Sequence, residues 1–131
     1  FSNVGLGIVH SMAHPLSAVY DIPHGVACAI LLTPVLKFNA PSTANKYRDI
    51  AVAMGVKNTE DMSIEQARQA CIEAVEKLSV DVGIPQKLTQ LGVKEEDLQF
   101  LSESAFVDAC TPGNPRNVSV EAIKEIYKSI M

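Results

Sequence analysis

The three histidines of this 131-residue sequence, His10, His14 and His24, all fall within fifteen residues of one another. Neutral imidazole is the commonest metal ligand among side chains, so such a cluster could supply part of a coordination shell. On a helix, His10 and His14 would lie one turn apart on the same face, because residues four apart are neighbours there. The spacing therefore predicts a metal site. The alternative is a set of core or interface histidines that hydrogen-bond to backbone.

His24 follows a turn, Asp21-Ile22-Pro23, and precedes the most apolar run of the sequence, Val26 to Leu36. In the first turn of a helix that begins there, its side chain would project back toward the other two histidines. The apolar run is interrupted by Thr33-Pro34 and spans about half the length that a bilayer-crossing helix needs. We therefore expect a core helix and no membrane contact.

The elements that position these residues are expected to be helices joined by short loops. Ser63 and Gln66 form a capping box in front of an amphipathic stripe that Gly83 ends. No segment longer than a few residues alternates as a half-buried strand does. The apolar positions of that stripe are Ile64, Ala67, Cys71, Ala74, Val75, Leu78 and Val82.

Further helices are predicted on both sides of this stripe. Pro15 is expected to kink a first helix or to end it near His14. The sequence thus predicts an all-α domain of about six or seven helices around one core. The remaining expected helices are a stripe from Tyr47 to Met54, a short helix from Pro85 to Leu91, one from Glu95 to Ala109, and a last helix capped by Ser119.

The composition excludes some functions. The net charge is −4 with 20% charged residues, so no basic stripe is available to neutralise a phosphate backbone, and nucleic acid is not an expected partner. Cys28, Cys71 and Cys110 are odd in number and far apart, which is typical of buried structural thiols in a reducing cytoplasm. Gly5 and Gly7 lack a third glycine at the right distance, so the dinucleotide fingerprint is not met.

The stretch from Gly5 to Leu16, GLGIVHSMAHPL, continued by Pro23-His24-Gly25-Val26-Ala27, resembles the signature of iron-containing (group III) alcohol dehydrogenases. Within that family the similarity is greatest to the lactaldehyde reductase and propanediol oxidoreductase branch, and it covers essentially the whole chain. Later landmarks of the same family are Leu31-Leu32-Thr33-Pro34-Val35, Phe38-Asn39, Val82-Gly83-Ile84-Pro85 and Gly113-Asn114-Pro115-Arg116.

The resemblance implies a two-domain enzyme. Residues 1–131 would be its C-terminal helical metal-binding domain, and an N-terminal α/β domain that binds NAD(P) would precede them. The metal would be held by an Asp and a His from upstream together with His10 and His24. His14 would lie beside the nicotinamide and the substrate as a catalytic residue and not a ligand. Fe(II) is the expected metal, and Zn would accept a similar ligand set.

The expected substrates are a small alcohol or diol, or an aldehyde such as lactaldehyde, and the intact enzyme is expected to be a homo-oligomer, a dimer. Phe1 and Cys110, the latter at the start of a loop that runs to Arg116, match positions that face the substrate cleft in relatives. An apolar contact and a helix-to-helix turn are their alternative interpretations. The isolated chain is expected to lack dehydrogenase activity. A non-catalytic helical interaction module with packed histidines is the alternative to the enzyme.

Overall fold

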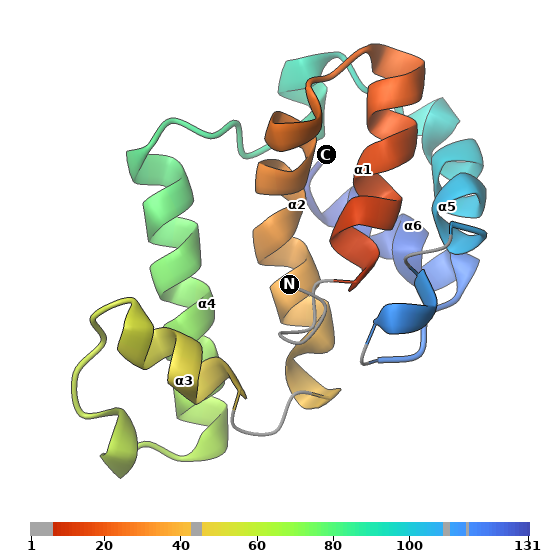
Figure 1. Ribbon diagram of the computed structural model, residues 1–131. Coiled ribbons are helices and arrows are strands. Elements are labelled where there is room, and N and C mark those ends of the chain that lie inside the picture. The colour runs from red at the N-terminus through yellow and green to blue at the C-terminus, as the bar shows by residue number, and fades with distance from the viewer. Residues whose placement is uncertain (1–6, 43–45, 109–110, 115) are drawn as a thin grey trace.

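A computed structural model describes residues 7–42, 46–108, 111–114 and 116–131. Within these residues it contains α-helices and short 3-10 turns but no strand, so the all-α prediction of about six or seven helices is confirmed (Figure 1). The six α-helices are α1 (Gly7–Tyr20), α2 (His24–Asn39), α3 (Lys46–Ala53), α4 (Ile64–Asp81), α5 (Leu98–Phe106) and α6 (Val120–Ser129).

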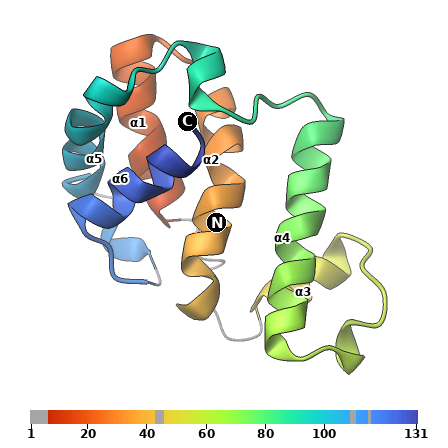
Figure 2. The same cartoon turned by 180° about the vertical axis from the view of Figure 1, so that it is seen from behind.

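The first helix, α1, lies between α2 and α5, and α6 packs on α5 behind it (Figures 1 and 2). Its inner face is fully buried through Ile8, Met12 and Leu16. The hydroxyl of the buried Tyr127, in α6, donates a hydrogen bond of 2.6 Å to the backbone carbonyl of Met12. Because α1 is covered on these sides, its remaining face, which carries His14, is the one left open.

Two prolines lie inside helices without ending them. Pro15 is buried within α1, which continues for five more residues, so of the two expected outcomes, a kink or an end near His14, the end does not occur. Pro34 is likewise buried within α2. A proline inside a helix costs about 3 kcal/mol through a lost hydrogen bond and a clash. Packing of the apolar faces around both prolines offsets that cost.

The helical stretch His24–Ser42 is, among the residues described, long and apolar enough to cross a membrane by length and composition alone. The core helix of a soluble protein passes the same test. Here α2 packs against α1, α4 and α6, which is the position of the core helix predicted from the sequence.

The capping box at the start of α4 is confirmed. The Ser63 hydroxyl oxygen accepts a hydrogen bond from the Gln66 backbone N–H at 3.1 Å, and the Gln66 side-chain oxygen accepts one from the Ser63 backbone N–H at 2.9 Å. The far end of the stripe differs from the prediction, because Leu78 and Val82 are 52% and 64% exposed. Figure 1 shows α3 crossing only the half of α4 that begins at Ile64.

Two predicted helices are shorter in the structure. Residues 85–87 are not helical, and only the 3-10 turn η4 (Leu88–Leu91) forms before Gly92. The backbone N–H groups of Gln86 and Lys87 donate to the Gln90 side chain, and that of Leu88 donates to the Ile130 carbonyl. These backbone N–H groups therefore bond to acceptors that are not the carbonyls of a helix through residues 85–87. The helix expected from Glu95 begins with a 3-10 turn, η5 (Glu95–Asp97), and α5 ends at Phe106.

Candidate metal centre

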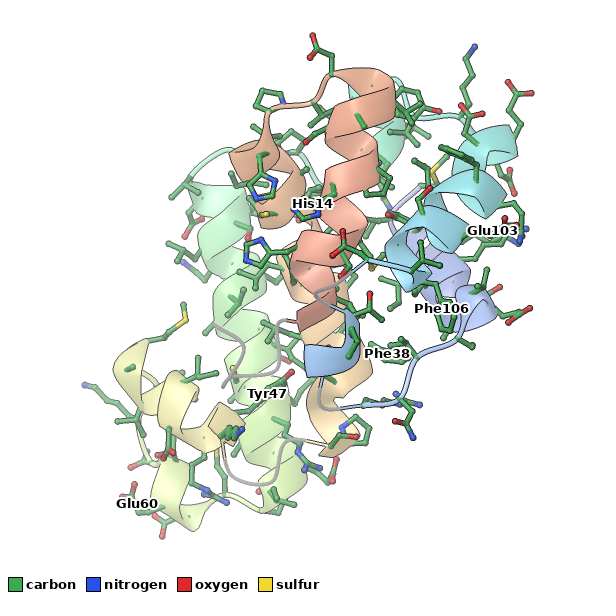
Figure 3. The ribbon with its side chains drawn as sticks, turned by 45° about the vertical axis from the view of Figure 1, so that its right-hand side comes forward. His14, Phe38, Tyr47, Glu60, Glu103 and Phe106 are labelled. Carbon is green, nitrogen blue, oxygen red and sulfur yellow. The ribbon has the colours of Figure 1, made fainter. Side chains whose placement is uncertain are left out.

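The structure brings the three histidines together on one open face. His10 and His14 project from α1, and His24 is the first residue of α2. The His24 ring stacks against both others, with ring centroids 5.6 Å from His10 and 5.5 Å from His14. Figure 3 shows His14 on the side of α1 that is turned toward α2. His10 is half-buried, whereas His14 and His24 are exposed.

The turn between α1 and α2 places His24. Asp21 has a φ of 56°, a left-handed conformation that Asp tolerates better than most residues. Its N–H donates to the Ser17 carbonyl at 3.0 Å, which closes the end of α1. Pro23 then stands at the N-cap of α2 with an extended ψ of 135°, so the chain reverses direction within three residues. The reversal sets His24 beside the side chains of α1.

Cys28 belongs to the same cluster, although the sequence predicted a buried structural thiol. It lies one turn after His24 on α2 and is half-buried. Its Sγ is 3.4 Å from His24 Nε2 and 3.9 Å from His10 Nδ1. Burial raises the pKa of the Cys28 thiol. The signal that could have identified it is its spacing of four residues from His24, the same spacing that marked His10 and His14.

The donor chemistry of this cluster fits a divalent transition metal. His10, His24 and Cys28 each offer one ligand atom, and these atoms all lie within 4.8 Å of one another. Bonds of about 2.0–2.3 Å from nitrogen and sulfur to one ion require donors this close. Imidazole suits iron and zinc alike, so the residues present fit the metal that the sequence resemblance implies.

His14 is held by a network that sequence reasoning missed. Its Nδ1 lies 2.7 Å from the Asp108 carboxylate, whose other oxygen accepts from the Ser11 hydroxyl at 3.4 Å. The Thr111 hydroxyl lies 2.9 Å from Ser11 Oγ and donates to the Ala105 carbonyl at 2.6 Å. A carboxylate at Nδ1 keeps the proton on that nitrogen, so in the neutral ring Nε2 carries the free lone pair. Asp108 therefore sets the orientation and the tautomer of His14.

The loop that the sequence analysis linked to the substrate packs against these elements. Its 3-10 turn η6 (Thr111–Gly113) contacts α1, and Asn114 exchanges two amide hydrogen bonds of 2.8 and 2.9 Å with the buried Asn39 at the end of α2. The Arg116 guanidinium lies 4.2 Å from the Phe38 ring centroid. The two predicted pocket residues, Phe1 and Cys110, lie outside the described residues.

Comparison with known proteins identifies the family of this chain. Residues 1–131 match the family model described as Fe-containing alcohol dehydrogenase family, C-terminal. Lactaldehyde reductase of Escherichia coli (strain K12) is 58% identical over 127 residues, which cover 97% of this chain and 33% of that protein. 1,3-Propanediol dehydrogenase of Citrobacter freundii is 44% identical over 128 residues, covering 98% and 33%.

The fold agrees as well. The crystal structure of a 1,3-propanediol oxidoreductase matches 95% of this chain with a TM-score of 0.91 and 41% identity, and the match covers 32% of that protein. An alcohol dehydrogenase from Oenococcus oeni matches with a TM-score of 0.88 and 37% identity. The chain thus spans about a third of the length of the relatives it matches. This chain belongs to the iron-containing alcohol dehydrogenase family and matches its C-terminal part.

Proposed function

We propose that this chain is the metal-binding helical domain of an NAD(P)-dependent oxidoreductase that interconverts a small alcohol or diol and the corresponding aldehyde. The convergence of His10 and His24 on one open face is the observation that carries the proposal. The names of the relatives, lactaldehyde reductase and 1,3-propanediol dehydrogenase, support the substrate class. The α/β domain that the family resemblance implies would bind NAD(P).

The free thiols of Cys28 and Cys71 suit a reducing compartment, so we place the enzyme in the cytoplasm.

His10 and His24 would hold the metal, proposed as Fe(II) with Zn as the alternative, together with an Asp and a His from the preceding domain. When bound, a divalent metal supplies Lewis acidity that stabilises an alkoxide and polarises an aldehyde carbonyl. The two histidines are suited to this role because they come from different helices joined by a three-residue turn. That turn keeps the donors close before any ion arrives.

His14 would move the proton of the substrate hydroxyl. Its Nδ1 faces Asp108, so Nε2 is the nitrogen that accepts a proton during oxidation and returns it during aldehyde reduction. Its side chain is 48% exposed, which leaves a path for that proton to solvent. NAD(P), when bound, accepts or donates the hydride. The stacking of the His14 ring on the His24 ring supports this role, because a proton acceptor at His14 would lie beside the proposed metal ligand.

The test compares the three histidines one at a time. In this chain, His10→Ala and His24→Ala are expected to weaken divalent metal binding at least about 10-fold. Even residues that only hydrogen-bond to a metal ligand change metal affinity about 10–100-fold when they are replaced. His14→Ala is the matched control, and it should leave metal affinity unchanged. In the full-length protein, all three variants should lose diol oxidation. Unchanged metal affinity in both His10→Ala and His24→Ala would reject the proposal and favour a non-catalytic helical module.

A further inference from the structure

Cys28 lies where a third protein ligand would lie beside His10 and His24. We propose that Cys28 Sγ binds the metal in this protein, so that the α1–α2 hairpin alone offers a Cys-His-His ligand set. The inference rests on the proposed function, because it takes His10 and His24 as metal ligands and adds a donor from the same chain. Neither the family resemblance nor the names of the relatives assign a role to this thiol.

The two distances from Cys28 Sγ to the histidine nitrogens are those expected of ligands that share one metal ion. With metal bonds of about 2.05 Å to nitrogen and about 2.3 Å to sulfur, a tetrahedral angle places nitrogen and sulfur ligands about 3.6 Å apart. Cys28 Sγ is 3.4 Å from His24 Nε2 and 3.9 Å from His10 Nδ1, so the two observed distances bracket that value. A sulfur atom close to only one of the histidines would not meet this condition.

Helix geometry explains why the thiol reaches the site. His24 and Cys28 are four residues apart at the start of α2, so their side chains lie on the same face, one turn apart. α1 supplies His10 from the other side of the hairpin. All three donors lie between positions 10 and 28, so they converge without any contribution from a distant segment. Metal binding through them would need only α1, α2 and the turn between them.

The third donor changes the expected metal preference. A thiolate is a softer ligand than imidazole or carboxylate and favours Zn(II) and Co(II) over Mg(II) or Mn(II). In the chain alone these three ligands leave further coordination positions open, and with the Asp and the His proposed from the preceding domain Cys28 would be a fifth protein ligand. Binding replaces the thiol proton: Cys–SH and M²⁺ give Cys–S–M⁺ and one H⁺, which passes to the buffer. The competing interpretation is a weak S–H hydrogen bond to one imidazole, with no metal bond.

Cobalt titration of the reduced, metal-free 131-residue protein under argon distinguishes the two. If Cys28 is a ligand, one equivalent of Co(II) produces a near-ultraviolet thiolate-to-cobalt charge-transfer band. Added Zn(II) then displaces the cobalt, and the band disappears. Cys28→Ser should abolish the band and lower Co(II) affinity at least about 10-fold, because even the loss of a residue that only hydrogen-bonds to a metal ligand lowers affinity by about that factor. Cys71→Ala is the matched control: it also removes one thiol, but from α4, and it should retain the band.

A second measurement does not depend on the colour of cobalt. X-ray absorption of the zinc-loaded protein should show one sulfur at about 2.3 Å, and Cys28→Ser should show none. Far-ultraviolet circular dichroism checks that the variant keeps its helices. Cobalt bound without the charge-transfer band, a band that survives in Cys28→Ser, or no cobalt binding by the wild-type chain would each overturn the inference. The proposed function fails on a different result, namely metal affinity that survives His10→Ala and His24→Ala.

Discussion

Asp108 and His14 form a pair that joins α1 to the segment after α5 at the site. Their contact of 2.7 Å connects residues 94 positions apart. The carboxylate is only 19% exposed, and Ser11 donates to its other oxygen, so its position is set from two sides. We regard Asp108 as a positioning residue that acts through His14.

Replacing Asp108 by Asn in the intact enzyme tests that role. The amide has the size of the carboxylate but no charge, so it should hold the Nδ1 proton of His14 less firmly. We expect kcat to fall about 10–100-fold, a part of the 10²–10⁴-fold that a proton-transfer group contributes, with the metal content unchanged. The measurement is steady-state kinetics beside metal analysis.

The double variant Asp108→Asn/His14→Ala controls for a structural effect. Residues that act as a unit lose activity non-additively, so Asp108→Asn should cost little once His14 is absent. An equal loss of activity in both backgrounds would show that Asp108 acts independently of this histidine.

At the site, the sequence could predict the cluster of histidines but not their support. His10, His14 and His24 are close in sequence, so helix spacing and one turn suffice to bring them together. Asp108 contacts His14 only because α5 packs on α1, and no local sequence pattern predicts a contact between residues 94 positions apart. Cys28 did carry a local signal, but free cysteines are most often buried hydrophobes, and that general tendency outweighed its spacing from His24.

Among the elements, the end of α2 and the loop after η6 are joined by side-chain amides. Asn39 is fully buried, and its amide pairs with that of Asn114 by two hydrogen bonds. The Arg116 guanidinium donates to the Phe38 carbonyl at 2.6 Å beside this pair. Phe38-Asn39 and the segment with Asn114 and Arg116, two family landmarks far apart in the sequence, are therefore in contact with each other.

Asn39→Ala is expected to destabilise the domain through this contact. It removes the two hydrogen bonds between the Asn39 and Asn114 amides, and Asn114 keeps only its bond to the Arg116 carbonyl. Each lost hydrogen bond costs about 0.5–1.5 kcal/mol in the free energy of unfolding, or about 1–3 kcal/mol together. Urea denaturation of the isolated chain measures the change. Asn39→Ala/Asn114→Ala should lose less than the sum of the single variants, because the residues are in contact. Additive losses would contradict the pairing, and Gln69→Ala, on the exposed face of α4, is the neutral control.

Helix boundaries could be predicted where the signal is local. The capping box of Ser63 and the glycines at 83 and 92, both with positive φ, end or begin elements as expected. Pro34 lies inside the core helix that was predicted, whereas Pro15 does not end α1 near His14, since tertiary packing outweighs the local penalty of a buried proline. The exposure of Leu78 could not be foreseen either, because the apolar stripe of α4 is longer than the helix that covers it.

On the scale of the whole molecule, the chain is expected to be inactive alone. The described residues hold no strand, and a dinucleotide site of the βαβ type needs one before its glycine-rich turn. We therefore expect no oxidation of reduced nicotinamide with lactaldehyde or a related aldehyde by the isolated chain, even with Fe(II) added. Absorbance of the reduced nicotinamide measures this, with the full-length protein as the positive control. Measurable turnover by the chain alone would contradict the division of roles between two domains.

The hydrogen bond from Tyr127 to the Met12 carbonyl, like the pair of Asp108 and His14, has a consequence for the order in which the protein acquires its shape on the ribosome. Translation proceeds at about 5–20 residues per second, so roughly 5–20 s separate the synthesis of His14 from that of Asp108. During that interval the histidine-bearing hairpin has emerged while α5 and α6 have not. A ribosome stalled before α6 would therefore carry a nascent chain whose first helix is still open to proteases.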